Sequence, residues 1–135
     1  MNLAWAKEWM ANFNGSGLEK TMAMYADDVQ FEDCTLGHKE NSRAALTKFF
    51  GGFFTPDMGE HDFVVTGYTG NADAGAAEWT WRSKHGAEFM GIPAAGKSTE
   101  TRGVSILTFR KGLVASQHDY WDMGAILRQL GAVKK

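Results

Sequence analysis

The sequence has little of several features that mark common classes of small protein. Its single cysteine, Cys34, excludes an internal disulfide and a cysteine-rich zinc module. No apolar run approaches the roughly 18 residues that span a bilayer, and 14 Lys and Arg against 16 Asp and Glu leave no basic stripe for a phosphate backbone. We therefore expect no membrane or nucleic-acid partner. The absence of disulfides and of a secretory-type leader indicates a cytoplasmic protein.

Aromatic residues, by contrast, are abundant. The 135 residues are 44% hydrophobic and include five Trp, nine Phe and seven Met against two Pro. A chain of this size forms one core, and no linker, repeat or low-complexity tract divides it, so we predict a single domain over residues 1–135. This much aromatic and thioether surface predicts an apolar internal lining.

Helical signals dominate the first third of the chain. Apolar residues at helical spacing predict a helix over 3–13. Ser16 with Glu19 three residues later has the form of a capping box and predicts a second helix that runs to Tyr25. Alternation then predicts a short strand over 29–33.

The rest of the chain predicts one more helix, a run of strands and a closing helix. Asn41 or Ser42 can cap a helix whose apolar stripe reaches Phe53, and Asp122 can cap a last helix that ends at Gly131. Between them lie four stretches rich in Val, Thr, Trp, Tyr and Phe: 61–69, 75–88, 99–111 and 113–121. Helices followed by a long-stranded antiparallel meander predict an α+β fold.

Asp33 is the first candidate for chemistry. If Val29 and Phe31 face the interior, the period of two places Asp33 on the same side and Glu32 outside. A carboxylate against an apolar interior has a raised pKa, which suits proton transfer. The alternative is an aspartate that caps backbone N–H groups at the end of the strand.

Asp119 is the second candidate. The same period places it between Gln117 and Trp121 on one face of the last strand, which helices should cover. An acid in that position is costly unless it is paired or functional. An ion pair is the alternative to a catalytic role, and the available partners are Arg82, Arg102 and Arg110.

His85 is the third candidate, because it shares the strand face of Trp79 and Trp81 and could exchange a proton near pH 7. It could equally be a half-exposed residue at the end of a strand. A metal site of His85, His118 and Asp119 is not expected, because His118 and Asp119 point to opposite faces.

Three stretches carry a resemblance to known families. Residues 17–20 and 24–33 resemble the first half of ketosteroid isomerases and the wider nuclear transport factor 2-like superfamily. Residues 103–131 are similar to SnoaL-like polyketide cyclases and limonene epoxide hydrolases, and Trp79 to Lys97 resembles the SnoaL-like stretch in which a histidine lines the pocket. The resemblance implies a cone: a curved antiparallel sheet with helices packed in its concavity, the cystatin-like or ketosteroid isomerase-like α+β barrel.

The resemblance also implies roles for single residues. Asp33 falls where the isomerases place a proton-shuttling carboxylate, and Asp119 falls where the epoxide hydrolases place an aspartate on the last strand, although their arginine–aspartate pair on the preceding strand has no clear counterpart. Trp9 and Ser105 replace the isomerase tyrosine and protonated aspartate that stabilise an oxyanion. The nearest candidates for the cyclase acid/base are Glu100 and Asp33.

These observations together favour a cofactor-independent acid/base enzyme of the isomerase, cyclase or hydrolase type. Its substrate would be a small hydrophobic molecule, carbonyl-bearing or cyclic, and its catalytic residues would be Asp33, Asp119 and His85, with no metal and no cofactor. A non-catalytic module that binds an apolar ligand is the alternative. The expected substrate-binding residues are Trp9, Tyr25, Phe53, Trp79, Trp81, Ser105 and Trp121.

Apolar residues occur on both faces of the strand around 103–109. Val104 and Ile106 have one parity, and Leu107 and Phe109 have the other. Burial on both sides is what a homodimer through the outer sheet face would provide, so we expect a second copy as a partner.

Overall fold

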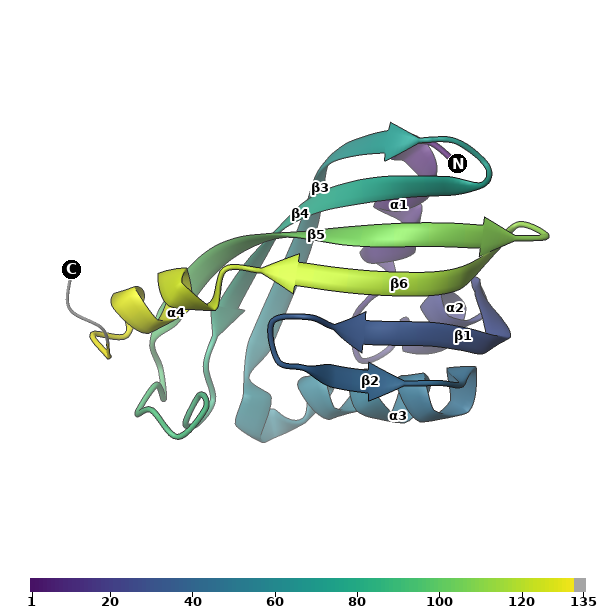
Figure 1. Cartoon of the computed structure of the whole chain (residues 1–135). Coiled ribbons are helices and arrows are strands. Elements are labelled where there is room, and N and C mark those ends of the chain that lie inside the picture. The colour runs from purple at the N-terminus through teal and green to yellow at the C-terminus, as the bar shows by residue number, and fades with distance from the viewer. Residues whose placement is uncertain (133–135) are drawn as a thin grey trace.

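The computed structural model describes residues 1–132, so the last three residues of the predicted domain lie outside the described part. Its helices and strands follow the predicted order (Figure 1): α1 (Leu3–Ala11), α2 (Leu18–Met22), β1 (Tyr25–Asp33), β2 (His38–Glu40), α3 (Arg43–Gly51), β3 (Glu60–Gly70), β4 (Ala74–Lys84), β5 (Ser98–Arg110), β6 (Leu113–Trp121) and α4 (Met123–Gln129). Two short 3-10 turns, Gly52–Phe54 and Pro56–Met58, link α3 to β3.

The six strands form one curved, unclosed sheet in the order β2-β1-β6-β5-β4-β3. Neighbouring strands are antiparallel except β1 and β6, which run parallel. α1, α2 and α3 all lie on one side of the sheet, and α4 follows β6 at its end (Figure 1). The predicted α+β fold, a curved sheet with helices in its concavity, is confirmed. No helix in residues 1–132 has both the length and the apolar character needed to cross a membrane.

Two of the three predicted helix caps are correct. The backbone N–H of Ala45 donates to Ser42 Oγ at 3.1 Å, and Asp122 caps α4 in the same way. The predicted capping box at Ser16 is wrong. Asn14 Oδ1 accepts from the backbone N–H groups of both Ser16 and Gly17, so Asn14 organises the turn and α2 begins two residues later.

Two strand boundaries differ from the prediction, and one short strand was not predicted. β1 begins at Tyr25, within the segment assigned to a helix, and the short β2 has no counterpart in the prediction. β4 ends at Lys84 instead of 88, because the chain bends at Gly86 and Ala87 and then enters a tight turn in which Met90 and Gly91 both have positive φ. This turn closes a small hairpin between Phe89 and Ile92.

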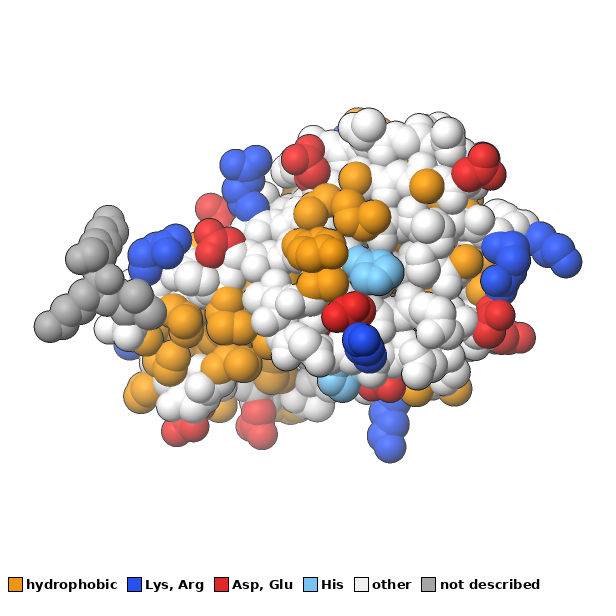
Figure 2. All heavy atoms as spheres, viewed as in Figure 1, with side chains coloured by type: hydrophobic (Ala, Val, Ile, Leu, Met, Phe, Trp, Pro, Cys, Tyr) orange, Lys and Arg blue, Asp and Glu red, His pale blue; other side chains and the backbone are white. Residues whose placement is uncertain are grey.

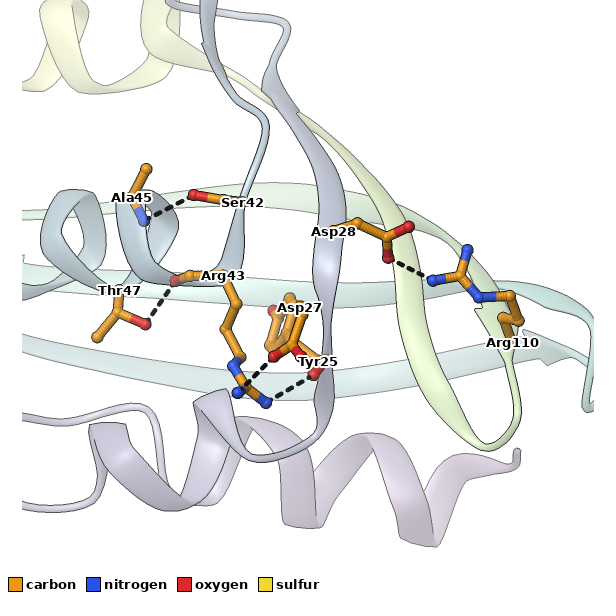
Figure 3. Close-up of polar contacts among 8 residues, drawn as sticks. All are labelled: Tyr25, Asp27, Asp28, Ser42, Arg43, Ala45, Thr47 and Arg110. Carbon is orange, nitrogen blue, oxygen red and sulfur yellow. Dashed lines mark hydrogen bonds and ion pairs between the residues drawn. The ribbon is translucent and has the colours of Figure 1, made fainter.

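Ion pairs on the surface hold the start of β1 against its neighbours (Figure 3). Arg43 of α3 contacts Asp27 at 2.5 Å and donates to the Tyr25 carbonyl oxygen at 3.3 Å, while Arg110 of β5 pairs with Asp28. Each pair is well exposed and contributes little to stability by itself. Their effect is to orient β1 between α3 and the centre of the sheet.

The outer face of the sheet carries an exposed apolar patch, which we define as Val104, Ile106 and Tyr120. Val104 and Tyr120 are cross-strand neighbours, and Ile106 lies beside His118. Ile106 is 42% and Tyr120 50% exposed. Figure 2 shows apolar side chains gathered at the middle of this face, next to a histidine and to charged residues.

Candidate active site

A cavity of about 270 Å³ lies between the helices and the concave face of the sheet. Its polar side chains are few, and they converge from β1, β5 and β6: Tyr25, Asp33, Ser105, Gln117 and Asp119, with Glu88 at the small hairpin. The remaining lining side chains are aromatic or aliphatic: Trp9, Met10, Phe13, Phe31, Leu36, Phe49, Phe50, Phe53, Met58, Phe63, Trp79, Trp81, Phe89, Met90 and Trp121. A concave apolar pocket with a few converging polar groups is typical of a small-molecule site.

Asp33 ends β1 inside this cavity and is 6% exposed. Its Oδ1 accepts the backbone N–H groups of Thr35 and Leu36 at 3.1 and 3.0 Å. The indole N–H of Trp121 lies 3.1 Å from Oδ1 and 3.0 Å from Oδ2. The capping interpretation made from the sequence is therefore confirmed, and Asp33 also lines the cavity, as the alternation predicted. Its part in proton transfer stays a prediction.

Asp119 is half-buried, lies on β6 directly beside Asp33, and is held differently. Its Oδ1 accepts from Ser105 Oγ at 2.6 Å and from Gln117 Nε2 at 2.9 Å. Within the part of the chain that the structure describes, no donor reaches Oδ2, which leaves that oxygen available to a ligand. Burial raises the pKa of Asp119 to about 7; the two hydrogen bonds oppose the shift, and the charge of Asp33 adds to it.

A buried chain of hydrogen bonds supports Asp119 from one side. Trp9 Nε1 donates to the Tyr25 hydroxyl at 3.0 Å, and that hydroxyl donates to Gln117 Oε1 at 2.5 Å. Gln117 in turn donates to Asp119. Burial strongly raises the pKa of Tyr25, so the phenol stays neutral and keeps the proton it donates. The chain fixes which end of the Gln117 amide faces Asp119.

A second chain reaches Asp119 from β4. The indole N–H of Trp79 donates to Ser105 Oγ at 3.0 Å, and the Ser105 hydroxyl in turn donates a hydrogen bond to Asp119 Oδ1. Trp79 can lie across β5 because its cross-strand neighbour is Gly103, where a Cβ atom would come within 2.4 Å of the indole ring. Gly103 is thus required by close approach of a side chain to the strand.

None of the three arginines considered as partners pairs with Asp119: Arg102 is exposed, and the other two pair with other acids. Arg82 pairs with Glu100 at 2.8 Å and with Asp62 at 3.6 Å, and Arg110 pairs with Asp28. Among the described residues, neither Asp33 nor Asp119 forms a salt bridge, and no Lys, Arg or His lines the cavity. The ion-pair interpretation of Asp119 is therefore wrong. Glu100 is exposed beside Arg82, away from the cavity, so it is not the second acid of this site.

His85 is buried but does not line the cavity. Its Nε2 lies 2.8 Å from Thr99 Oγ1, its ring packs against Phe89 at 5.3 Å between centroids, and burial lowers its pKa. The parity argument placed it on the correct face, but the following hairpin brings Phe89 to the cavity instead. His85 also bonds through its backbone to Lys97 and Gly96, which anchors that hairpin.

All seven of the expected substrate-binding residues line the cavity, and the alternation that placed Asp33 and Asp119 inward is as predicted. Their roles in binding remain predictions. The sequence analysis missed the hairpin residues Glu88, Phe89 and Met90, because their place at the cavity depends on the fold of a loop. It also missed the link between Tyr25 and Gln117, which are 92 residues apart. No group of three His, Cys, Asp or Glu in residues 1–132 is arranged to hold a metal ion.

The comparisons with known proteins agree with this architecture. A family model described as the SnoaL-like domain matches residues 6–117. The sequence has no significant match among curated proteins.

Solved structures with similar folds share little sequence with this chain. AclR from Streptomyces galilaeus, a proposed hydroxylase, has a TM-score of 0.77 at 23% identity, covering 95% of this chain and 83% of that one. A proposed polyketide cyclase from Xanthomonas campestris has a TM-score of 0.74 at 20% identity, and the match covers 90% of each chain. A protein of ketosteroid isomerase-like fold from Catenulispora acidiphila, in complex with trimethylamine, has a TM-score of 0.78 at 16% identity. The match covers 98% of this chain and 96% of that one. The chain belongs to the SnoaL-like domain family and has the ketosteroid isomerase-like fold.

Proposed function

We propose that this protein is a cofactor-independent enzyme that transfers protons on a small hydrophobic substrate carrying a carbonyl group. The observation that supports this most is the pair Asp33 and Asp119, which line one apolar cavity without a cationic partner among the described residues. Two acids whose surroundings differ this much can serve as a base and an acid at the same pH.

In the proposed reaction, the Asp33 carboxylate removes a proton from the carbon next to the carbonyl. The electron pair of that C–H bond moves into the new C–C double bond, and the carbonyl π pair moves to oxygen. Protonated Asp119, through Oδ2, donates its proton to that oxygen and an enol forms. In a β,γ-unsaturated ketone the product is a dienol, and Asp33 would return the proton to its γ carbon while the enol O–H proton goes back to Asp119, which completes an isomerisation. In a cyclisation the enol carbon would attack a second carbonyl, whose oxygen takes the proton held by Asp33, while the enol O–H proton returns to Asp119.

Asp119 is the acid in this scheme because other donors are already engaged. The indole N–H groups of Trp9 and Trp79 and the hydroxyl of Ser105 all donate to protein acceptors. The resemblance implied that Trp9 and Ser105 stabilise an oxyanion. We assign that role to Asp119 instead, because the hydrogen-bond chains of Trp9 and of Ser105 both end at Asp119. His85 has no part in the proposed reaction.

Solvent deuterium exchange into cyclic ketones and β-dicarbonyl compounds, followed by NMR, tests the proposal, with epoxide hydrolysis measured alongside. Asp33→Asn and Asp119→Asn should each slow exchange by about a hundredfold or more. Asp73→Asn is the matched control, because Asp73 lies in an exposed turn away from the cavity. Unchanged rates in both cavity variants would reject the proposed mechanism.

The alternative is a non-catalytic protein that binds an apolar ligand. It is favoured by the closed hydrogen-bond chains and by the mostly aromatic lining, which bind without any chemistry. Ligand binding by wild type without exchange or turnover would support this alternative. The trimethylamine in the Catenulispora structure adds small amines to the ligands that merit testing.

A second copy of the chain is the partner that we infer for the outer apolar patch. Val104, Ile106 and Tyr120 form a continuous surface at the middle of the sheet, which can pack on its own copy about a two-fold axis. Light scattering should report a dimer for wild type and a monomer for Ile106→Asp. Leu3→Asp, on the exposed side of α1, should stay dimeric. A monomeric wild type would overturn this inference.

A further inference from the structure

The charges that line the cavity are all of one sign. Asp33, Asp119 and Glu88 contribute carboxyl groups, and among the described residues the lining contains no Lys, Arg or His. Asp33 and Asp119 occupy facing positions of neighbouring strands, so their like charges act on each other. Such a site repels an anion and favours a ligand that brings a positive charge.

The lining also offers few side-chain hydrogen-bond donors. Trp81 donates to His61 at 3.0 Å and Trp121 donates to Asp33, while the other indole and hydroxyl donors support Asp119. Only the second N–H of Gln117 is left without a protein acceptor among the described residues. A ligand of this cavity can therefore accept few hydrogen bonds from the lining, and it must bring hydrogen-bond donors or a positive charge of its own.

Aromatic rings form most of the cavity lining. Phe63 and Trp81 stack with ring centroids 5.7 Å apart, and Trp121 meets Trp81 edge-on at 5.5 Å. The faces of Trp and Phe rings attract organic cations, most strongly where water is excluded. Aromatic rings and carboxyl groups that line the same cavity form the combination that recognises a substituted ammonium group.

We propose that the ligand of this cavity is a hydrophobic organic cation, whose protonated or quaternary amine lies against the aromatic rings in the field of Asp33 and Asp119. The proposal concerns the same cavity as the proposed function and names its substrate class: a carbonyl compound that also carries a cationic nitrogen. A positive charge beside the C–H bond would acidify the proton that Asp33 removes. Binding alone tests the inference, so it does not depend on turnover.

Three probes of nearly equal shape separate charge from size. Phenyltrimethylammonium, tert-butylbenzene and benzenesulfonate each join a phenyl ring to a tetrahedral group, which is positive, neutral or negative. At pH 8, where a pKa of about 7 leaves Asp119 mostly ionised, tryptophan fluorescence and calorimetry should show the cation binding about tenfold more tightly than tert-butylbenzene. Benzenesulfonate should not bind measurably.

Substitution of each carboxylate tests whether the carboxylates cause the preference for the cation. Asp33→Asn and Asp119→Asn should each reduce the affinity for phenyltrimethylammonium severalfold and leave the affinity for tert-butylbenzene within about twofold, which also shows that the cavity is intact. Asp73→Asn should change neither affinity. Equal affinities for the cation and tert-butylbenzene, tighter binding of benzenesulfonate, or no binding of the cation would overturn the inference. Cation binding without deuterium exchange would leave the inference standing and reject the proposed enzyme, and exchange without a preference for the cation would do the reverse.

Discussion

Asp33 and Asp119 lie at the same level of two parallel strands, yet their hydrogen bonds differ in kind. Asp33 accepts from N–H groups on both oxygens, whereas Asp119 accepts on one oxygen only, and burial raises its pKa to about 7. One fold thus gives two neighbouring carboxyl groups different hydrogen-bond surroundings. Four of the predictions below follow from this pair and the groups that hold it, and the other concerns the glycine that makes room for Trp79.

The first prediction concerns stability and pH. The folded state holds a proton on Asp119 up to about pH 7, while the unfolded state releases it near 3.8, so the folded state binds more protons between these values. Stability that depends on Asp119 is therefore greatest at low pH and is lost as the pH rises from about 4 to 7. Asn carries no ionisable proton, so the free energy of unfolding of Asp119→Asn minus that of wild type should be about 2 kcal/mol larger at pH 8 than at pH 5. Urea unfolding at both pH values measures the difference, and an equal effect at both would contradict the assignment.

The second prediction concerns the rate of proton exchange. If protonated Asp119 is the acid, kcat/KM should fall about tenfold for each pH unit above the pKa of the free enzyme, about 7. Asp119→Asn should be slow at every pH and lack this descending limb. A limb that persists in the variant would assign the ionisation to another group.

Much of the cavity could be predicted from alternation alone. The period of two placed Asp33, Gln117, Asp119 and Trp121 on the inner face, because burial in a sheet follows parity along each strand. The hydrogen-bond partners of these side chains could not be predicted from alternation. Trp121 reaches Asp33 across 88 residues, and only the parallel pairing of β1 with β6 brings them together.

The predictions from the sequence were wrong where two short-range patterns compete. Ser16 and Glu19 have the form of a capping box, but Asn14 Oδ1 accepts from the Ser16 N–H, which Glu19 would accept in such a box, and also from the Gly17 N–H. His85 has the parity of the inner face, but the turn at Met90 and Gly91 folds the next segment back over it. Loop geometry, and not strand periodicity, decided both outcomes.

The third prediction tests the support of Asp33. Trp121→Phe removes the indole N–H that both oxygens of Asp33 accept, and should cost about 1–3 kcal/mol of stability because the lost bond involves a charged acceptor. The same variant should slow deuterium exchange. Trp5→Phe is the control, since the indole of Trp5 stacks on Trp9 without a hydrogen bond to any described residue. If both variants lose the same amount of stability, the contact with Asp33 contributes nothing beyond ring volume.

The fourth prediction concerns the position of Trp79. Gly103→Ala would place a methyl group 2.4 Å from the indole, so the ring or the strand must shift, and we expect the hydrogen bond from Trp79 to Ser105 to weaken. We expect a loss of about 2–4 kcal/mol and weaker ligand binding. Gly52→Ala is the matched control, because its Cβ meets no atom within 4 Å and its φ of −63° suits alanine. Equal stability of the two variants would show that β5 adjusts without disturbing Trp79.

The fifth prediction concerns the chain that ends at Asp119. Tyr25→Phe leaves Trp9 Nε1 and Gln117 Oε1 buried without their partner, and should cost about 2–4 kcal/mol in urea unfolding. Tyr68→Phe is the control, because the Tyr68 hydroxyl is buried without a partner among the described residues and its removal should be neutral or stabilising.

Carbon-13 NMR of the Asp119 carboxyl group gives a readout that a purely structural effect would not move. Without Tyr25 to orient it, Gln117 should lose its hydrogen bond to Asp119, a bond that lowers the pKa. The pKa of Asp119 should therefore rise above its wild-type value in Tyr25→Phe and stay unchanged in Tyr68→Phe. An unchanged titration in Tyr25→Phe would mean that Ser105 and the β6 backbone hold Asp119 without help from the buried chain.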